Sequence, residues 1–136
     1  MKTVLALCAA LLLASPALAE TVRPESIRVV DGDTLAIGGD KLRLLTIDAP
    51  ETHKPRCAAE AVKGEEATAR MSALIRNARR VEIQDSGRRD KYRRRLVDVI
   101  VDGRDAGAIL MGEGLAVPWR PGRAAWQERY EHWCGR

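Results

Sequence analysis

The 136-residue sequence has no run of apolar residues long enough to cross a bilayer. Its longest run, residues 4–14, covers about eleven residues, whereas a membrane-spanning helix needs roughly twenty. The run follows Lys2 and leads to the small residues Ala-Leu-Ala, which is the pattern of a secretory signal. We therefore expect residues 1–19 to be a signal peptide cleaved after Ala19, with secretion or export to the periplasm and no membrane anchor. The mature chain, residues 20–136, is long enough for one domain but not for two.

Cysteine and histidine are both scarce, with three and two residues. Cys8 lies in the expected signal peptide, so Cys57 and Cys134 remain, an even number that favours a disulfide in an oxidising compartment. That bond would close a loop of nearly eighty residues and stabilise the fold by about 4 kcal/mol. The alternative is two unpaired thiols. His53 and His132 lie singly in polar stretches without a partner at metal-ligand spacing, so we expect them at the surface.

The chain also lacks a strong net charge. Its 23 basic and 19 acidic residues give a net charge of +4, which falls to about +3 when Lys2 is removed with the signal peptide. Composition alone therefore says little about nucleic acid. Eighteen of the basic residues are arginine, a side chain that suits bidentate phosphate binding.

No internal repeat, low-complexity tract or linker interrupts the mature chain. Short β-prone runs flank the turn signals Asp31-Gly32 and Gly38-Gly39-Asp40. The expected elements are strands at 26–30, 34–37, 41–47, 81–84 and 96–101, and helices at 58–78 and 106–113. Gly64 is the weakest point of the longer helix. This order is typical of an OB-fold, a five-stranded β-barrel with helices in the α+β class. No long apolar helix face calls for a partner, so we expect a monomer.

Four carboxylates gather around Arg43 within residues 29–52: Asp31, Asp33, Asp48 and Glu51. Like charges on adjacent loops repel each other, so the cluster requires solvent or a bound cation. Asp33, at the end of a hairpin turn, and Asp48, after the third strand, can meet at one rim of the barrel. Calcium and magnesium prefer such oxygen ligands. The alternative is that each motif only forms its turn or strand end, where Asp and Gly are favoured anyway.

Five motifs occur together in the order and spacing of a known family: VVDGDT, LRLLTIDAPET, GEEA, DKYRRRL and GEGLA. Over residues 25–118 the chain resembles the thermonucleases, or staphylococcal nuclease-like proteins. The resemblance implies an SNase-like OB-fold barrel with two to three helices and a secreted Ca²⁺-dependent endonuclease. Its substrates would be DNA and RNA, preferably single-stranded and without strong sequence preference, and its products would carry 3′-phosphates. The alternative function is a non-catalytic OB-fold module that binds nucleic acid or a protein.

The resemblance also implies a calcium site. The metal ligands would be Asp33, Asp48 and the main-chain carbonyl of Ala49. Asp31 would lie beside the metal and act through water.

The remaining matched residues have catalytic or substrate-binding roles in the family. Glu51 matches the essential carboxylate that orients or deprotonates the attacking water. Arg43 and Arg94 match the two phosphate-binding arginines. Lys91 and Tyr92 match residues that contact a terminal phosphate of bound nucleotide. Arginines and a divalent cation can together neutralise the charge that a pentacovalent phosphate gains.

The chain departs from the family pattern at the second arginine. The family commonly has Tyr-Gly-Arg, whereas residues 92–95 read Tyr-Arg-Arg-Arg. Loss of the glycine changes the backbone freedom before the catalytic side chain. A one-residue shift along the strand would present Arg93 or Arg95 in place of Arg94. Arg93 is also a candidate for binding a flanking phosphate.

Tryptophan replaces tyrosine in a second departure. Trp119 follows the GLA motif where the family has tyrosines, and it either stacks on a base or packs on the barrel. We expect Trp126 and Trp133 to form the core of a short C-terminal cap held by Cys134.

Overall fold

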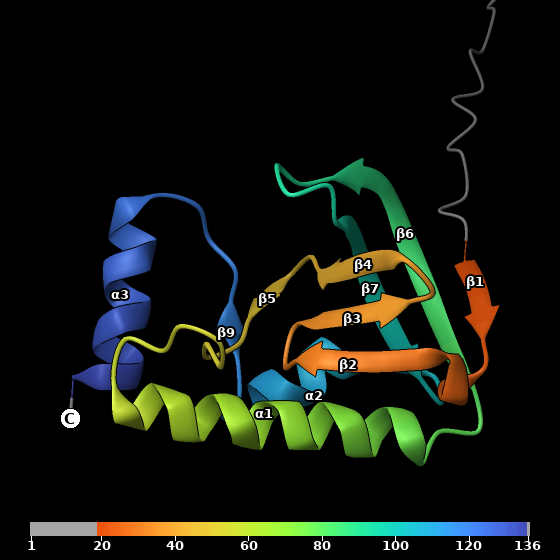
Figure 1. Ribbon diagram of the computed structural model, residues 1–136, viewed down its shortest axis with the longest axis horizontal. Helices are drawn as coiled ribbons and strands as arrows, with labels where there is room; N and C mark the ends of the chain where they lie inside the picture. Colours follow the sequence, from red (N-terminus) through yellow and green to blue (C-terminus); the bar gives the residue numbers. More distant parts are fainter. Residues whose placement is uncertain (1–18, 136) are drawn as a thin grey trace, which may run out of the picture.

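The computed structural model describes residues 19–135 of the chain. The expected signal peptide lies outside the described residues except for Ala19. Within the described part, no helix combines the length and apolar character needed to cross a membrane. Figure 1 shows a curled sheet above one long helix, with a second helix standing beside them.

The main sheet is mixed and has seven strands in the described part of the chain. In spatial order, six of them are β1 (Ala19–Val22), β6 (Val81–Arg89), β7 (Arg95–Val101), β4 (Asp40–Leu44), β3 (Thr34–Ile37) and β2 (Ile27–Asp31), and β8 (Arg104–Asp105) pairs with β7. All neighbours are antiparallel except β4 and β7, which run parallel. A separate antiparallel pair, β5 (Ile47–Asp48) and β9 (Val117–Pro118), joins two segments far apart in the sequence.

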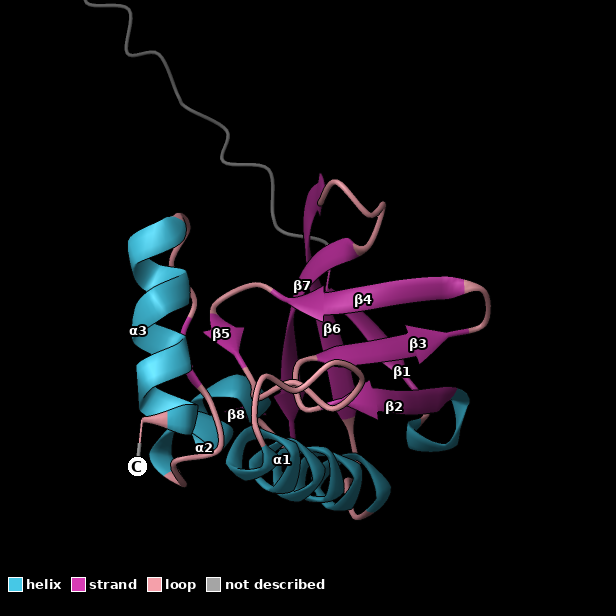
Figure 2. Ribbon diagram, turned by 60° about the vertical axis from the view of Figure 1, so that its left-hand side comes forward, coloured by secondary structure: helices cyan, strands magenta, loops and turns pink. Residues whose placement is uncertain are grey.

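Helices cover the sheet and one of its ends. They are α1 (Ala58–Arg76), α2 (Ala106–Gly112) and α3 (Arg123–Cys134), with a 3-10 turn, η1 (Pro24–Ser26), before β2. Figure 2 shows α1 running beneath the curled sheet and α3 on the side of β5. Ala67, Met71 and Ile75, four residues apart on α1, are buried, as expected for a helix with one face on the core.

The core lies between the sheet and the helices α1 and α2. Alternate residues of β7 are buried, namely Val97, Val99 and Val101, as the two-residue period of a strand requires. They share one cluster with Met71 of α1 and Leu110 of α2. Full burial of each such side chain contributes about 1.5–3 kcal/mol. This core fixes the strand ends that carry the polar residues described below.

The predicted order of elements and the OB-like α+β class are confirmed. One expected strand, 41–47, is interrupted, because β4 ends at Leu44 and β5 begins at Ile47. The carbonyls of these two residues turn toward the Arg43 guanidinium instead of continuing a ladder. The sheet is also open: in the described residues β1 and β2 form its two edges. It is therefore a curled half-barrel, which is consistent with the expected OB-like class.

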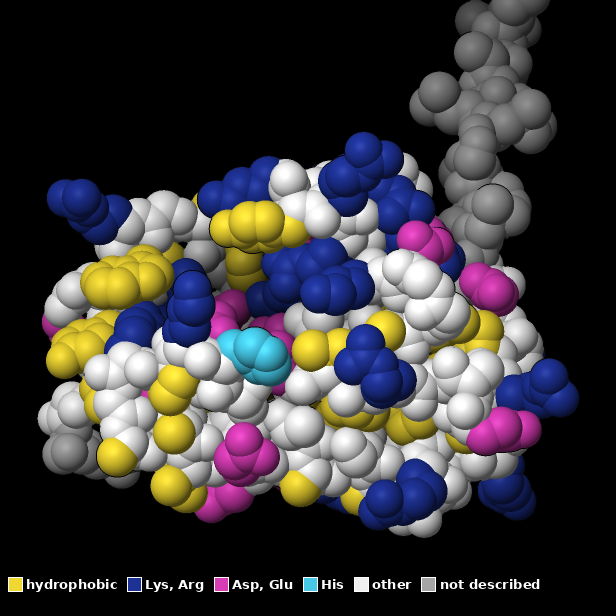
Figure 3. All heavy atoms as spheres, in the orientation of Figure 1, with side chains coloured by type: hydrophobic (Ala, Val, Ile, Leu, Met, Phe, Trp, Pro, Cys, Tyr) yellow, Lys and Arg dark blue, Asp and Glu magenta, His cyan; other side chains and the backbone are white. Residues whose placement is uncertain are grey.

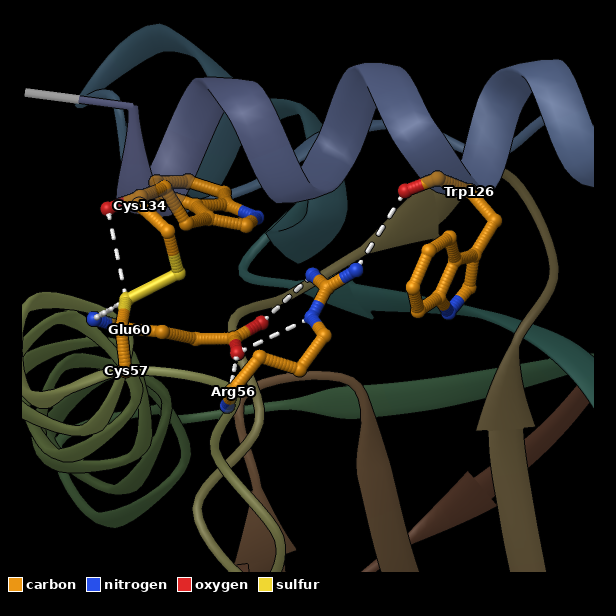
Figure 4. Close-up of a disulfide and its surroundings, with 6 residues drawn as sticks. Arg56, Cys57, Glu60, Trp126 and Cys134 are labelled. Atoms are coloured by element: carbon orange, nitrogen blue, oxygen red, sulfur yellow. Dashed lines mark hydrogen bonds and ion pairs between the residues drawn. A yellow bond between two sulfur atoms is a disulfide. The ribbon is translucent and has the colours of Figure 1, made fainter.

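The expected short cap is the twelve-residue helix α3. The disulfide between Cys57 and Cys134, 77 positions apart, ties its end to the start of α1, and Figure 4 shows this junction. Trp133 is buried as expected. The expectation for Trp126 was wrong, because its ring lies over the Arg56 guanidinium and stays 49% exposed.

Removing the disulfide should lower the free energy of unfolding by about 4 kcal/mol, because the bond restricts a long loop of the unfolded chain. Urea unfolding of the oxidised protein and of a Cys57→Ser/Cys134→Ser variant measures this difference. Reductant should shift the unfolding midpoint of the parent protein but not that of the variant. Equal midpoints for the two oxidised proteins would contradict the prediction.

Candidate active site

A cleft of about 600 Å³ lies at one end of the sheet. Its walls come from the β2–β3 turn, β4, β5 and the loop that follows, the loop between β6 and β7, and the segment after β9. The lining residues are Asp31, Asp33, Thr34, Arg43, Leu44, Leu45, Asp48, Glu51, Arg88, Asp90, Lys91, Tyr92, Arg94, Leu96 and Trp119. In Figure 3, acidic atoms lie deep in a hollow surrounded by basic side chains.

The β2–β3 turn places the first two acids of the cluster. Asp31 pairs with Thr34, so the two turn residues are Gly32 and Asp33. A Cβ atom on Gly32 would lie 2.8 Å from the Cβ atoms of both Ala49 and Ala67. Any other residue at position 32 would therefore require α1 to move. Asp31 accepts a hydrogen bond from the Asp33 amide at 3.2 Å and so holds the turn.

Asp33 is buried, with its side chain 10% exposed, and its carboxylate is held on both oxygens. Oδ2 accepts a hydrogen bond from the Ala49 amide at 2.6 Å, and Oδ1 accepts one from the Thr34 hydroxyl at 3.1 Å. Burial raises the pKa of Asp33 to about 7; the charge of Arg43 opposes this rise and that of Asp31 adds to it. The cluster therefore disfavours the charged form of Asp33.

Arg43 is buried at the centre of the cluster. Its Nη1 donates to the carbonyl oxygens of Leu44 at 2.6 Å and Ile47 at 2.8 Å. Its Nη2 lies 2.8 Å from Asp48 Oδ1 and 3.1 Å from Asp33 Oδ2. One guanidinium therefore bridges the two carboxylates and fixes the turn between β4 and β5.

Glu51 follows β5 on a loop that crosses α1 at Gly64. A Cβ atom on Gly64 would lie 2.9 Å from the Glu51 carbonyl oxygen and 3.0 Å from that of Pro50. The glycine that weakens the helix is thus what lets the Glu51 loop approach it. Partial burial raises the pKa of the Glu51 carboxyl, and the negative charges of Asp31 and Asp48 raise it further.

The loop between β6 and β7 presents Arg94 to the cleft. Asp90 organises this loop: its Oδ1 accepts from the amides of Tyr92 and Arg94, and its Oδ2 accepts from Arg94 Nε at 2.7 Å. Arg95 instead lies 2.7 Å from Asp85, and neither Arg95 nor Arg93 lines the cleft. Of the three consecutive arginines, the structure therefore brings Arg94 to the acidic cluster.

Of the other predicted substrate-binding residues, three line the cleft and one does not. Lys91, Tyr92 and Trp119 line the cleft, and Tyr92 and Trp119 are largely exposed. The Trp119 amide donates to the Thr46 carbonyl at 2.9 Å, which continues the β5–β9 pairing and holds the tryptophan at the rim. Arg93 is exposed and does not line the cleft.

Two further arginines, which no sequence motif indicated, hold acidic side chains at or beside the site. Arg129 of α3 places Nε 2.6 Å from Asp48 Oδ2; no local pattern connects two residues so far apart. Arg56 makes several hydrogen bonds to Glu60, which is 1% exposed, and their i,i+4 spacing was a visible signal. Burial alone would raise the pKa of Glu60, but the bonds from Arg56 lower it below its ordinary value.

The donor chemistry of the cluster fits a hard divalent cation. All its side-chain donors are carboxylate oxygens, the ligands that calcium and magnesium prefer. Within residues 19–135, however, no three Asp, Glu, His or Cys side chains converge closely enough to form a ready metal cage. Asp33 and Asp48 are bridged by Arg43, so a cation would compete with Nη2 of that arginine, and water or substrate oxygens would complete its shell.

Comparison with known proteins points to one family. A family model described as staphylococcal nuclease homologue matches residues 41–133. SPbeta prophage-derived endonuclease YokF of Bacillus subtilis is 40% identical over 94 residues, which are 65% of this chain and 31% of YokF. Endonuclease YncB of the same species is 38% identical over 94 residues, 65% of this chain and 44% of YncB. Protein ParB of Escherichia coli is 34% identical over 131 residues, 86% of this chain and 68% of ParB. The chain spans less than half the length of either endonuclease.

The backbone of Arg93 generates a stability prediction. Its φ of 66° lies in the left-handed region, where a side chain costs about 1–2 kcal/mol. The Arg93→Gly variant should therefore be more stable than Arg93→Ala by about 1 kcal/mol, even though glycine gains more entropy on unfolding. Both variants lack the arginine charge, so urea unfolding compares the backbone alone. An alanine variant as stable as the glycine variant would show that the loop relaxes to another conformation.

Proposed function

Because the chain belongs to the family of staphylococcal nuclease homologues, we propose that it is a Ca²⁺-dependent endonuclease that hydrolyses phosphodiester bonds of DNA and RNA. The observation that carries this proposal is one cleft that combines acids and arginines from separate segments: Asp31, Asp33, Arg43, Asp48, Glu51 and Arg94. The endonuclease names of two relatives support the reaction class.

The arginines suit a phosphodiester. The transition state of phosphodiester hydrolysis gains negative charge on the phosphate oxygens, and fixed positive groups stabilise it most when they need no rearrangement. A guanidinium can hold two such oxygens at once. Asp90 fixes Nε of Arg94 at the cleft wall. The two Nη groups of Arg94 make no hydrogen bond within the described residues. Two carbonyls hold Nη1 of Arg43, so Nη2 is the group left to donate to a phosphate when a cation takes the carboxylate oxygens.

The proposed metal ligands are Asp33, Asp48 and the main-chain carbonyl of Ala49, with Asp31 acting through water. Bound there, Ca²⁺ would supply positive charge to the phosphate and orient it. The protein contributes a preformed turn: the Ala49 amide on Asp33 keeps these groups in one place. The packing of Gly32 on Ala49 brings together residues 31–33 and 48–49, which are far apart in the sequence.

Glu51 is the proposed general base. It lines the cleft on the loop that Gly64 admits, and its raised pKa makes it a better proton acceptor than an ordinary carboxylate. Glu51 would take a proton from the water that attacks phosphorus in line with the 5′-oxygen. The new P–O bond forms as the P–O5′ bond breaks, the 5′-oxygen takes a proton from solvent water, and the products carry a 3′-phosphate and a 5′-hydroxyl.

Unpaired strands are the proposed substrates. Trp119 and Tyr92 expose their rings at the cleft, and bases stack on such rings without sequence preference. Lys91 beside them adds positive charge for a phosphate. The same proposal includes secretion or export to the periplasm, on the sequence pattern of residues 1–19. It also includes action as a monomer, because the sequence shows no long apolar helix face.

The test is cleavage of denatured DNA by the purified oxidised protein in Ca²⁺ and in excess chelator. We expect shortening of the DNA only with Ca²⁺, and Glu51→Gln should lower turnover by about 10² to 10⁴. Unchanged turnover in Glu51→Gln would refute its role as base.

The competing function is a binding module, because both carboxylates already have arginine partners: Arg43 bridges Asp33 and Asp48, and Arg129 pairs with Asp48. Such a module would bind oligonucleotide equally well in chelator and never shorten it. That outcome, with the protein shown to be folded, would replace the nuclease proposal.

Arg94 and Arg95 make a matched pair for a second test. Arg94→Lys removes a bidentate contact to the phosphate and should lower turnover about 10²-fold or more. Arg95→Lys changes the same chemistry one position away, where the side chain faces Asp85, and should leave turnover unchanged. Steady-state kinetics on one oligonucleotide measures both. A larger loss in Arg95→Lys than in Arg94→Lys would show that the loop shifts by one residue when substrate binds.

A further inference from the structure

Helix α3 exposes two aromatic rings side by side. The centroids of Trp126 and Tyr130 are 6.2 Å apart and their planes differ by 10°. Their side chains are 49% and 37% exposed. Exposed aromatic side chains that lie together mark a candidate interaction surface. We refer to this pair as the α3 step.

The α3 step is held rigidly from below. The guanidinium carbon of Arg56 lies 5.2 Å from the Trp126 ring centroid and 5.7 Å from that of Tyr130. Arg56 is itself fixed by the buried Glu60 and donates to the Trp126 carbonyl at 3.3 Å, as Figure 4 shows. Each ring therefore has a cation on one side, while its exposed surface faces solvent. A partner that binds this surface loses little entropy in ordering it.

The α3 step lies at the rim of the candidate active site. Trp126, Arg129 and Tyr130 follow at i, i+3 and i+4, so they share one side of α3. Arg129 reaches Asp48 in the acidic cluster. Hydrogen bonding to Glu60 is the main cause of the raised pKa of Arg56, but Asp48 and Glu51 lie close enough to raise it further. In Figure 3, hydrophobic side chains over α3 appear on the same face as the acidic hollow.

Flat rings backed by a cation and next to an arginine-lined cleft fit a nucleobase better than an apolar protein segment. We propose that the α3 step is a base-stacking subsite for an unpaired nucleotide of the strand that enters the cleft. This inference deepens the proposed function and rests on it. The strand would contact aromatic rings at two places: at Trp119 and Tyr92 in the cleft, and beyond it at Trp126 and Tyr130. A dinucleotide would reach only the cleft.

The test compares a dinucleotide with a single strand of about ten nucleotides, within the site sizes of known single-strand binders. The variant is Trp126→Leu/Tyr130→Leu, which keeps apolar bulk on α3 but removes the aromatic faces. Binding of the ten-nucleotide strand is measured by fluorescence anisotropy in chelator, so that no cleavage occurs. We expect its Kd to rise about tenfold or more, and kcat/KM for the dinucleotide in Ca²⁺ to stay unchanged.

Matched variants separate stacking from folding. Trp126→Phe/Tyr130→Phe keeps aromatic faces and should restore most of the affinity for the ten-nucleotide strand. Val62→Leu, at an exposed apolar position on α1, should change nothing. Urea unfolding verifies that α3 stays folded in each variant. An unchanged Kd in the leucine variant, or an equal loss in the leucine and phenylalanine variants, would overturn the inference.

The two proposals fail in different ways. A parent protein that never shortens DNA, but whose binding depends on the α3 step, refutes the nuclease and leaves the stacking subsite standing. A parent that cleaves with Ca²⁺, and whose Kd for the long strand is indifferent to the leucine changes, refutes the subsite alone. A parent that sediments as a dimer, with a leucine variant that sediments as a monomer, would assign the α3 step to self-association instead.

Discussion

The arrangement of the site depends on the buried guanidinium of Arg43. Nη1 holds the carbonyls of Leu44 and Ile47, and Nη2 holds Asp33 and Asp48. This one group interrupts the third expected strand and directs the chain that follows toward the cleft. Without it, two largely buried carboxylates would share a site with no central counter-charge, and loss of one partner of such a group costs about 3–5 kcal/mol.

The C-terminal helix completes the site although it lies outside the half-barrel. Arg129 approaches the outer oxygen of Asp48, Arg56 connects α3 to the start of α1, and the disulfide ties the far end of α3 to the same place. Because these contacts join α3 to the loop that carries Glu51, displacement of the helix would disturb both the acidic cluster and the aromatic rim. Stability and the geometry of the cleft are therefore coupled through one short helix.

The acids and arginines of the cleft neutralise one another in this structure, and the same groups suit the proposed chemistry. Asp33 and Asp48 have the oxygens a divalent cation would take, while Arg43 and Arg94 have the forks that a phosphate would take. Burial is the main cause of the raised pKa of Asp33, so the site disfavours the charged form of this carboxylate unless positive charge is added near it. A cation and a phosphate bound together would satisfy both sets at once.

The sequence by itself determined the order of the five strands and two helices that it predicted, the acidic cluster around Arg43, and the preferred pairing of Cys57 with Cys134, because turn signals, residue periodicity and motif spacing are local properties or counts. The short strands β1, β8 and β9 were not predicted. Only the tertiary structure decided that Arg94 faces the cleft, since that depends on how Asp90 folds its loop. The contact of Arg129 with Asp48 and the outward position of Trp126 likewise depend on where α3 docks. The pairing of β1 with β6 at one edge of the sheet joins segments about sixty residues apart, which no local pattern encodes.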